Sequence, residues 1–329
     1  MNDTVYITGH KNPDTDSIVA SIAYAYLKNQ KGQRAVACRL GPLNQETSYV
    51  LNRFGFDEPL LLEDARVRVG EIEYAKPLYV GADCTIFNAL KIMYTNGKPF
   101  LAVIDHEYRV IGMVTKNDLS MVGLGDTAFG IDLLKQTPVE NVVNTLEGAL
   151  IYKAKNPHAN GKVSIVALSD RRTKYYDVKD RIVVIGEDVE AQKDLIKKGA
   201  AMLIMVWTDT IDEEVVTLAK EYDCSLVISG LGVMNTSRYI YFSPAVSLLM
   251  STNVDMFYEY EYMEDLVRKL TKTQHKSYPI IDRDKHFLGF LYKEHAINYP
   301  RKKMILVDHN EFSQSVNHIR HADVVEVVA

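Results

Sequence analysis

Short apolar runs and longer amphipathic stretches alternate along most of this chain. At the N-terminus, residues 5–7 are apolar enough for a buried strand, and residues 18–27 carry apolar side chains with helical continuity. Asp16 or Ser17 is suited to cap the start of that helix. The pattern therefore predicts a strand, a polar loop and a helix at the N-terminus.

The middle of the chain, between about residues 123 and 252, shows the same alternation. The apolar runs that predict buried strands cover residues 163–167, 182–185, 202–206 and 226–229. The amphipathic stretches that predict the intervening helices cover residues 189–198 and 213–222. Strands that alternate with helices of this length indicate a parallel or mixed sheet.

Two segments repeat one another without gaps at an offset of 177 residues. Residues 102–105 align with residues 279–282, and the aspartate that ends each segment lies seven residues before a glycine, Gly112 or Gly289. Upstream of both segments, apolar residues form one face of a helix. Each copy therefore predicts the order helix, strand, turn, strand and helix.

Composition narrows the function without identifying it. The 329 residues are enough for two or three domains, and 47% apolar with 25% charged residues is ordinary for a soluble globular protein. The net charge of −5 argues against broad nucleic-acid binding, which needs a basic surface. Three widely spaced cysteines indicate neither a disulfide framework nor a zinc knuckle. Because the sequence shows no signal peptide and no apolar run of membrane-spanning length, we expect a cytoplasmic protein without membrane contact.

The loop at residues 9–17 carries the candidate chemistry. His10, Asp14 and Asp16 follow the predicted strand and precede the predicted helix. One histidine and two carboxylates at a helix N-terminus suit a divalent cation and a phosphate group. The alternative is that the acidic residues and Ser17 only cap the helix, although capping needs a single such residue.

This loop resembles the opening motif of the family II inorganic pyrophosphatases, which belong to the DHH phosphoesterase superfamily. The resemblance implies that His10, Asp14 and Asp16 bind two transition-metal ions. Mixed imidazole and carboxylate ligands favour Mn²⁺ or Co²⁺ over Mg²⁺, which prefers oxygen ligands.

The segment after residues 303–307, which read as a further buried strand, resembles a second motif of the same family. Its Asp-His-Asn string begins at Asp308, and in that family the aspartate bridges the metal ions. The resemblance thus implies catalytic roles for Asp308 and Asp16. It also suggests that Glu311 orients one of the metal ligands.

The two repeated segments resemble a pair of CBS domains. In CBS domains that bind adenine nucleotides, residues at the Thr115 and Asp118 positions hold phosphate and ribose, because a carboxylate can accept both ribose hydroxyls. The second copy has Tyr292 and His295 instead, so there the ring of Tyr278 or Tyr292 is expected to stack on a base. The full set of expected nucleotide-binding residues is Lys98, Pro99, Phe100, Thr115, Asn117, Asp118, Ser277 and Tyr278. The alternative is a scaffold that binds no ligand.

The resemblances together imply an α/β architecture. A partial DHH-type parallel-sheet domain would be interrupted by two CBS domains that flank an α/β DRTGG-like domain. The DRTGG string itself is absent, and the default role of that domain is a spacer or dimerisation module. The implied boundaries are 1–65 and 301–329 for the catalytic parts, 66–122 and 253–300 for the CBS domains, and 123–252 for the DRTGG-like domain.

The function implied by the whole pattern is metal-dependent hydrolysis of inorganic pyrophosphate, regulated by adenine nucleotides. The family implies inhibition by AMP and ADP, activation by ATP or dinucleoside polyphosphates, and a homodimer. Residues 323–329 read as a buried strand where the family continues into its Asp-His-His motif, so we expect a truncated chain that is inactive alone. Two alternatives stay open: an adenine-nucleotide sensor with vestigial hydrolase motifs, and a DHH phosphodiesterase, against which the net charge speaks.

Overall fold

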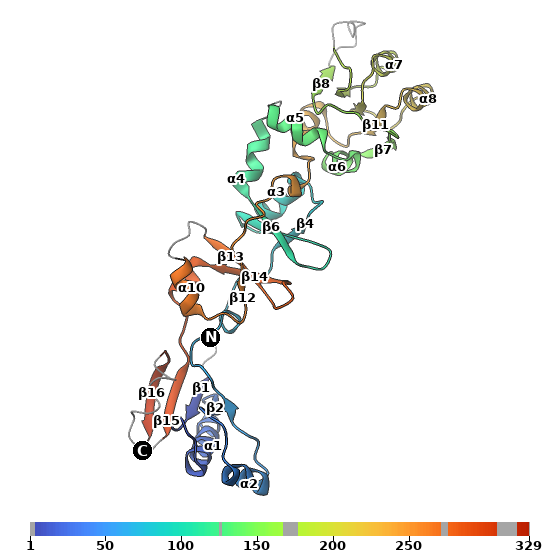
Figure 1. Cartoon of the computed structure of the whole chain (residues 1–329). Helices are drawn as coiled ribbons and strands as arrows, with labels where there is room; N and C mark the ends of the chain where they lie inside the picture. The colour runs from blue at the N-terminus through green and yellow to red at the C-terminus, as the bar shows by residue number, and fades with distance from the viewer. Residues whose placement is uncertain (1–3, 125–126, 167–176, 271–275, 308–320, 329) are drawn as a thin grey trace. The chain divides into compact units, whose positions relative to one another are not determined.

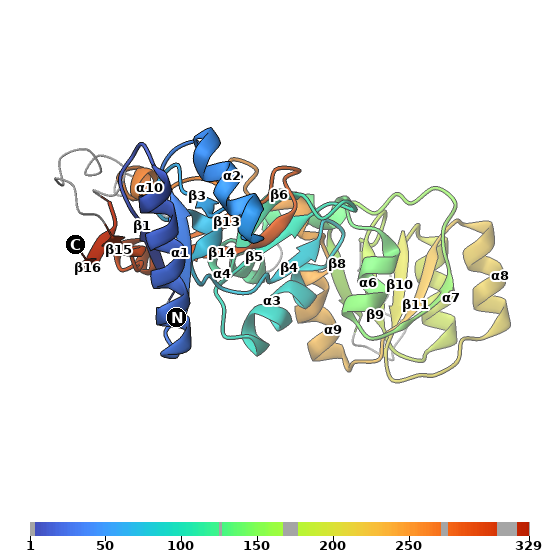
Figure 2. The same ribbon diagram turned by 90° about the horizontal axis from the view of Figure 1, so that it is seen from below.

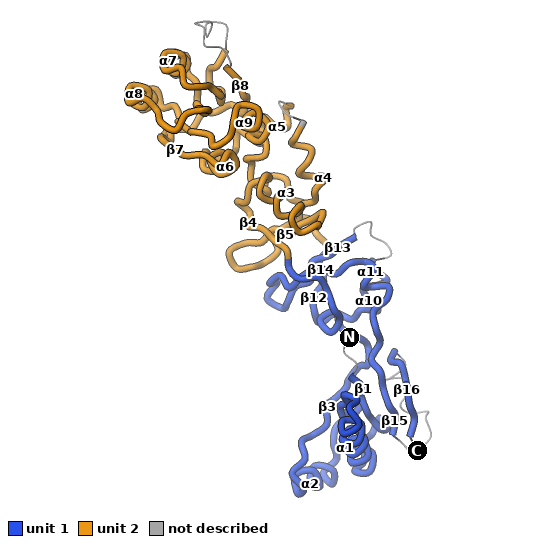
Figure 3. Tube along the Cα trace, turned by 180° about the vertical axis from the view of Figure 1, so that it is seen from behind, with its two compact units in different colours: residues 1–77, 255–329 blue, residues 78–254 orange. Residues whose placement is uncertain are grey.

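The computed structural model describes residues 4–124, 127–166, 177–270, 276–307 and 321–328. The chain forms two compact units, one made of residues 1–77 and 255–329 and the other of residues 78–254 (Figure 3). Helices and mostly parallel sheets build both units, which confirms the expected α/β class. None of the helices in the described part of the chain has the length and apolar character needed to cross a membrane.

The first unit contains a five-stranded parallel sheet with the strand order β16-β15-β1-β2-β3. Its strands are β1 (Val5–Thr8), β2 (Ala35–Arg39), β3 (Leu60–Leu61), β15 (Lys303–Val307) and β16 (Asp323–Val328). The helices α1 (Thr15–Gln30) and α2 (Gln45–Phe54) belong to the same part of the unit. Strand β1 pairs with β2 on one side and with β15 on the other (Figure 1). The strands expected at residues 5–7 and 303–307 are therefore confirmed, and they lie side by side.

The central strands of this sheet bury both of their faces. Ile7 and Ile305 pack with Ala25 of α1 on one face. Met304 and Leu306 pack into a separate apolar core on the other face. Successive strand residues point to opposite faces, so a strand buried on both sides needs a continuous apolar run, as residues 304–306 provide.

Strand β16 differs from the prediction of a buried strand. It is the edge strand of the described sheet, and three valines are 43–51% exposed: Val324, Val325 and Val327. Between them, the Glu326 carboxylate accepts a hydrogen bond from the Tyr24 hydroxyl at 2.5 Å and one from Lys28 Nζ at 2.6 Å. Both donors lie on α1, so polar contacts as well as backbone pairing attach β16 to the unit.

The second repeated copy completes the first unit. It consists of β12 (Phe257–Tyr258), α10 (Met263–Leu270), β13 (Ser277–Ile281), β14 (Phe287–Tyr292) and α11 (Lys293–Ile297), with the sheet order β12-β13-β14. Its core also contains Val67, Val69 and Ile72, which precede the first copy in the sequence. A segment next to the short helix η1 (Val69–Glu71) thus packs into a domain formed almost two hundred residues later.

The second unit contains the first copy, built from β4 (Tyr79–Gly81), α3 (Ile86–Thr95), β5 (Phe100–Ile104), β6 (Val110–Thr115) and α4 (Lys116–Ser120). Its strand order β4-β5-β6 matches that of the other copy, which confirms the internal repeat. In both copies the repeated aspartate, Asp105 or Asp282, accepts hydrogen bonds from the backbone N–H groups two and four residues later, at 2.8–2.9 Å. The carboxylate stabilises the tight turn between the antiparallel strands, in which Tyr108 and Lys285 have positive φ angles of 61° and 68°.

The rest of the second unit is a mixed sheet with the order β7-β11-β10-β9-β8, in which only β7 is antiparallel to its neighbour. The strands are β7 (Ala149–Tyr152), β8 (Val163–Val166), β9 (Ile182–Ile185), β10 (Met202–Met205) and β11 (Ser225–Ile228). The helices are α5 (Ala128–Lys135), α6 (Val139–Thr145), α7 (Val189–Lys197), α8 (Glu213–Glu221) and α9 (Val233–Tyr239), with short turns η2 (Met121–Leu124), η4 (Ile240–Phe242) and η5 (Val246–Leu248). Helices α7 and α8 lie on one side of β10 and β11, and α9 lies on the other (Figure 2). The strands and helices expected here are all confirmed, each end to within one residue.

Candidate functional site

The N-terminal loop connects the carboxyl end of β1 to the start of α1. Asp14 is the N-cap of α1, and its Oδ1 atom accepts a hydrogen bond from the backbone N–H of Ser17 at 2.9 Å. The expected caps, Asp16 and Ser17, lie inside the helix instead, because the helix already begins at Thr15. The carboxylate that caps the helix is thus one of the three expected metal ligands.

His10 and Asp14 are brought together by this loop. His10 Nε2 lies 3.4 Å from Asp14 Oδ1, and their side chains are 17% and 50% exposed. The pKa of Asp14 is lowered, first by the hydrogen bond from the Ser17 N–H and then by the neighbouring His10, against the opposite effect of partial burial. Asp14 is therefore held as a carboxylate beside an imidazole nitrogen.

Three polar atoms around this loop are buried and make no hydrogen bond: Thr8 Oγ1, His10 Nε2 and Ser17 Oγ. An unpaired buried polar atom costs about 1–3 kcal/mol, so such a cluster suits a group supplied from outside the chain. An imidazole nitrogen next to a carboxylate is a ligand set that Mn²⁺ and Co²⁺ accept. The residues present therefore fit the metal ions that the sequence motif implies.

Gly9 lets the strand end approach the helix closely. A Cβ atom at Gly9 would lie 1.9 Å from Ser17 Oγ and 3.2 Å from the Val307 carbonyl oxygen. The ends of β1, α1 and β15 therefore meet at this glycine. The sequence position that follows Val307 is Asp308.

The described structure does not place the remaining expected metal ligands next to His10 and Asp14. Asp16 lies in the first turn of α1 and its side chain is exposed. His10, Asp14 and Asp16 do not form a group with all ligand atoms within 4.8 Å of one another. Asp308 and Glu311 lie outside the described residues.

The structure brings Thr115 and Asp118 of the first repeated copy into contact. Thr115 is the N-cap of α4, and Asp118 Oδ2 accepts hydrogen bonds from Thr115 Oγ1 at 2.7 Å and from Thr115 N–H at 3.0 Å. The backbone N–H of Lys116 donates to the Pro99 carbonyl at 2.8 Å, which fixes the segment of Lys98 beside the start of α4. Asn117, like Thr115 and Asp118, is exposed, whereas Phe100 is 8% exposed. A hydroxyl and a carboxylate thus lie side by side on the surface.

The corresponding part of the second copy is different. Ser277 and Tyr278 are buried, and the Tyr278 ring packs against Phe257 with 5.2 Å between centroids. The expectation that Tyr278 stacks on a base is therefore wrong in this structure, because its strand position, equivalent to that of the buried Leu101, points into the core of its own domain. Tyr292 remains half-buried and contacts the ring of His295.

Two features of the sites were missed at the level of sequence. The buried hydroxyl of Thr8 ends an apolar run directly before Gly9, and a polar residue at that place is the signal that could have found it. Asp282, Asp284 and His286 form a group whose ligand atoms lie within 4.8 Å, and their alternate spacing is visible in the sequence. Asp282 is already used by the hydrogen bonds of its turn, so this group is explained by local structure.

Sequence models of three families match consecutive parts of the chain. The DHH family N-terminal domain matches residues 4–123, the DRTGG domain matches residues 141–241, and the CBS domain matches residues 246–302. The DRTGG match covers the central mixed sheet even though the string that gives the family its name is absent.

Several relatives and a solved structure are similar to the chain. The cobalt-dependent inorganic pyrophosphatase of Clostridium perfringens is 30% identical over 100% of this chain and 60% of that protein, and the probable manganese-dependent inorganic pyrophosphatase of Thermotoga maritima is 28% identical over 99% and 60%. The chain thus spans about three fifths of the length of these relatives. A crystal structure of the CBS and DRTGG domains of the C. perfringens pyrophosphatase, complexed with the activator diadenosine tetraphosphate, covers 69% of this chain and all of that chain with a TM-score of 0.61 at 22% identity, which shows a shared fold. The chain therefore carries a DHH-family N-terminal domain together with DRTGG and CBS domains, and it is similar over its whole length to the manganese- and cobalt-dependent inorganic pyrophosphatases.

Proposed function

We propose that this chain forms the metal-binding and regulatory part of a manganese- or cobalt-dependent inorganic pyrophosphatase. The observation that carries the proposal is the buried Nε2 atom of His10, which lies 3.4 Å from the Asp14 carboxylate at the carboxyl end of β1. The similarity to named pyrophosphatases over the whole chain supports the same assignment. As in those relatives, the reaction is the hydrolysis of pyrophosphate to two phosphates.

Four residues are proposed to hold the metal ions: His10, Asp14, Asp16 and Asp308. When bound, two such ions supply a water of lowered pKa as nucleophile and neutralise charge on the phosphates. Asp14 keeps the start of α1 in place while offering its carboxylate, and the N-terminus of α1 favours negative charge nearby. Asp16 and Asp308 are the proposed catalytic ligands, and Glu311 is proposed to orient one of them.

Binding of Mn²⁺ to the chain tests this site directly. In a titration followed by electron paramagnetic resonance, His10→Ala is expected to weaken Mn²⁺ binding at least tenfold, because it removes one ligand from the described pair. His158→Ala is the matched control, since His158 also lies near an aspartate, Asp180, at 3.7 Å but is 38% exposed. Equal Mn²⁺ affinity in the wild type and His10→Ala contradicts the metal site and favours a nucleotide sensor with vestigial motifs.

We also propose that the first CBS copy binds an adenine nucleotide that regulates the activity. The placement of Thr115 beside Asp118 supports it, because both side chains are exposed at the start of α4. On binding, the Thr115 hydroxyl would turn its proton from Asp118 to a phosphate oxygen, and the freed carboxylate would accept from the ribose hydroxyls. Lys98, Pro99, Phe100 and Asn117 complete the proposed site in this copy. Ser277 is proposed as a nucleotide-binding residue of the second copy. AMP, ADP, ATP and dinucleoside polyphosphates are the proposed effectors, and the enzyme is proposed to be a cytoplasmic homodimer.

Titration calorimetry with AMP and ATP tests the nucleotide site. Asp118→Ala is expected to weaken binding by about 1–3 kcal/mol, the usual contribution of hydrogen bonds to a charged group. Glu107→Ala removes an exposed carboxylate elsewhere in the same copy and is expected to leave binding unchanged. Failure of the wild type to bind either nucleotide below millimolar concentration shows that the CBS copies are scaffolds.

A further inference from the structure

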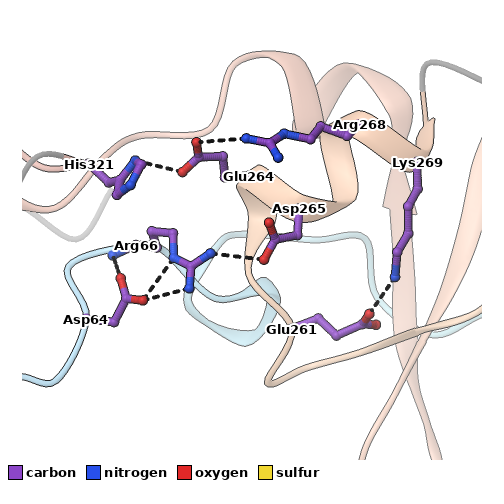
Figure 4. A network of polar contacts seen from close by, with 8 residues as sticks. All are labelled: Asp64, Arg66, Glu261, Glu264, Asp265, Arg268, Lys269 and His321. Carbon is purple, nitrogen blue, oxygen red and sulfur yellow. Dashed lines mark hydrogen bonds and ion pairs between the residues drawn. The ribbon is translucent and has the colours of Figure 1, made fainter.

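A charged cluster lies where the chain leaves the parallel sheet of the first unit (Figure 4). Its centre is Arg66, whose guanidinium contacts Asp64 Oδ2 at 2.7 and 2.9 Å and Asp265 Oδ2 at 3.0 Å. The same guanidinium lies 3.9 Å from the centre of the Tyr262 ring. Asp64 follows the sheet strand β3, whereas Tyr262 and Asp265 lie at the start of α10 in the second CBS copy, so one side chain connects the two parts.

Two further segments of the sheet side meet at the same place. Lys302, the residue before β15, lies 3.0 Å from Glu71 Oε1 and donates to the Arg66 carbonyl oxygen at 3.2 Å, with its side chain 11% exposed. His321 Nδ1, just before β16, lies 2.8 Å from Glu264 Oε2 on α10 (Figure 4). Arg66, in the outgoing segment at residues 64–71, and His321 therefore contact the first turn of α10 directly. Lys302 is attached to the outgoing segment through Glu71 and the Arg66 carbonyl oxygen. We call this set of contacts the α10 joint: Asp64, Arg66, Glu71, Tyr262, Glu264, Asp265, Lys302 and His321.

Backbone hydrogen bonds strengthen the joint. The Val69 N–H donates to the Glu261 carbonyl, and the Met263 N–H donates to the Val67 carbonyl, both at 2.9 Å. Because Val67 and Val69 also lie in the core of the second copy, the outgoing segment is held on two sides. Isolated surface ion pairs contribute little to stability, whereas several charges that form one network contribute more. In this network Lys302 is 11% and Arg66 26% exposed, while the backbone bonds and the core contacts of Val67 and Val69 hold the segment in place.

Helix α10 is suited to carry such a displacement. Met263, Leu266 and Leu270 are at most 2% exposed and anchor the helix in the core of the second copy. Close-packed cores move as rigid bodies, so a shift of strands β13 and β14 shifts α10 as well. The charged first turn of α10 then moves against the ends of β3, β15 and β16.

We infer that the α10 joint couples the second CBS copy to the parallel sheet, with Arg66 as the positioning residue at its centre. The inference rests on the proposed function only for its purpose, which is to let a displacement of the second copy reach the proposed metal site. Strand β15 ends beside Gly9, so the coupled strand is the one that lies against the His10 loop.

Hydrogen–deuterium exchange on the chain, without any ligand, tests the coupling. Ile280→Val loosens the core of the second copy, and we expect the amides of β1 and β15 to exchange about fivefold faster as a result. In an Arg66→Gln background, the increase is expected to stay within β13 and β14. Asp265→Asn provides a second, milder way to open the joint, and Arg268→Gln is the matched control, since Arg268 lies on the same helix but is 77% exposed and 3.8 Å from its partner.

The outcomes separate the inference from the proposed function. The coupling is overturned if Ile280→Val speeds amide exchange in β1 and β15 equally with and without the Arg66→Gln or Asp265→Asn change. It is also overturned if Ile280→Val alone speeds exchange only in the second copy. Hydrogen exchange in the presence of AMP tests the proposed nucleotide site separately. Absence of any AMP-dependent protection contradicts the nucleotide site, while the Ile280→Val comparison still decides on the joint.

Discussion

Gly9 sets the distance between the end of β1 and the start of α1. With a Cβ at this position only 1.9 Å from Ser17 Oγ, any larger residue must displace the buried Ser17 side chain in the first turn of the helix. The loop that holds His10 spans this same gap, so the spacing of two elements and the placement of a proposed metal ligand depend on one missing methyl group.

Gly9→Ala is expected to lower the free energy of unfolding by about 1–3 kcal/mol, as overpacking at a buried contact usually does. Chemical denaturation of the chain measures it. Gly186→Ala is the matched control, because a Cβ there meets nothing within 4 Å and its backbone has no positive φ. A Gly9→Ala variant as stable as the control contradicts the close approach described for the loop.

At the scale of elements, the attachment of β16 depends on charge. The pKa of Glu326 is lowered, first by the hydrogen bond from Lys28 and then by that from Tyr24. A carboxylate with a lowered pKa in the folded state contributes stability above its unfolded pKa of about 4.3, and this contribution is lost as the pH falls through the folded value. The edge strand is therefore expected to loosen in acid before the centre of the sheet does.

Hydrogen exchange measured as a function of pH, corrected for the intrinsic rate, tests this behaviour. In the wild type, protection of residues 323–328 is expected to fall below about pH 4, whereas β1 keeps its protection. Glu326→Gln is expected to expose β16 at neutral pH and to remove most of its acid dependence. Glu58→Gln, which removes a 60% exposed partner of Arg39 in the same unit, serves as the control. Equal acid dependence of β16 in both variants argues against the Glu326 contacts.

Local patterns in the sequence predicted the elements well but not their partners. The apolar runs located strands β8 to β11 to within one residue. Strands β9, β10 and β11 are buried at every position and need a continuous apolar run, whereas β8, at the edge of the described sheet, is only partly buried. The exposure of β16 was not predictable, since Val324, Val325 and Val327 read as buried and only the sheet order shows that the strand is an edge. The same limit applies to Tyr278, whose ring direction follows from strand register.

At the scale of the whole molecule, the charged residues of the α10 joint are contacts that local sequence patterns do not predict. Arg66 and Asp265 are almost two hundred positions apart, and the sequence around neither residue indicates that the two form an ion pair. The metal motif could be read because His10, Asp14 and Asp16 lie within seven consecutive residues. A site whose residues all lie in one loop can be predicted from the sequence. A site whose residues come from distant elements can be found only once the fold is known.

The division into two units predicts which fragments fold. Residues 78–254 contain two complete apolar cores of their own, so this fragment is expected to unfold cooperatively when produced alone. Residues 1–77 include β1 but lack its neighbour β15, and that fragment is expected to remain largely unfolded. Circular dichroism with thermal denaturation compares the two. A cooperative transition for residues 1–77, or none for residues 78–254, contradicts the division.

The pairing of β1 with β15 also fixes an order of events during synthesis. Val5 and Lys303 are partners in the sheet, so the strand pairing of highest sequence separation in the described sheet involves its central strand, β1. A chain that emerges from the ribosome N-terminus first can complete residues 78–254 while β1 still waits for its neighbour. Contacts of this kind form slowly, because the ends of a long loop must first meet. The His10 loop is consequently expected to acquire its final shape last, after residues 78–254 have folded.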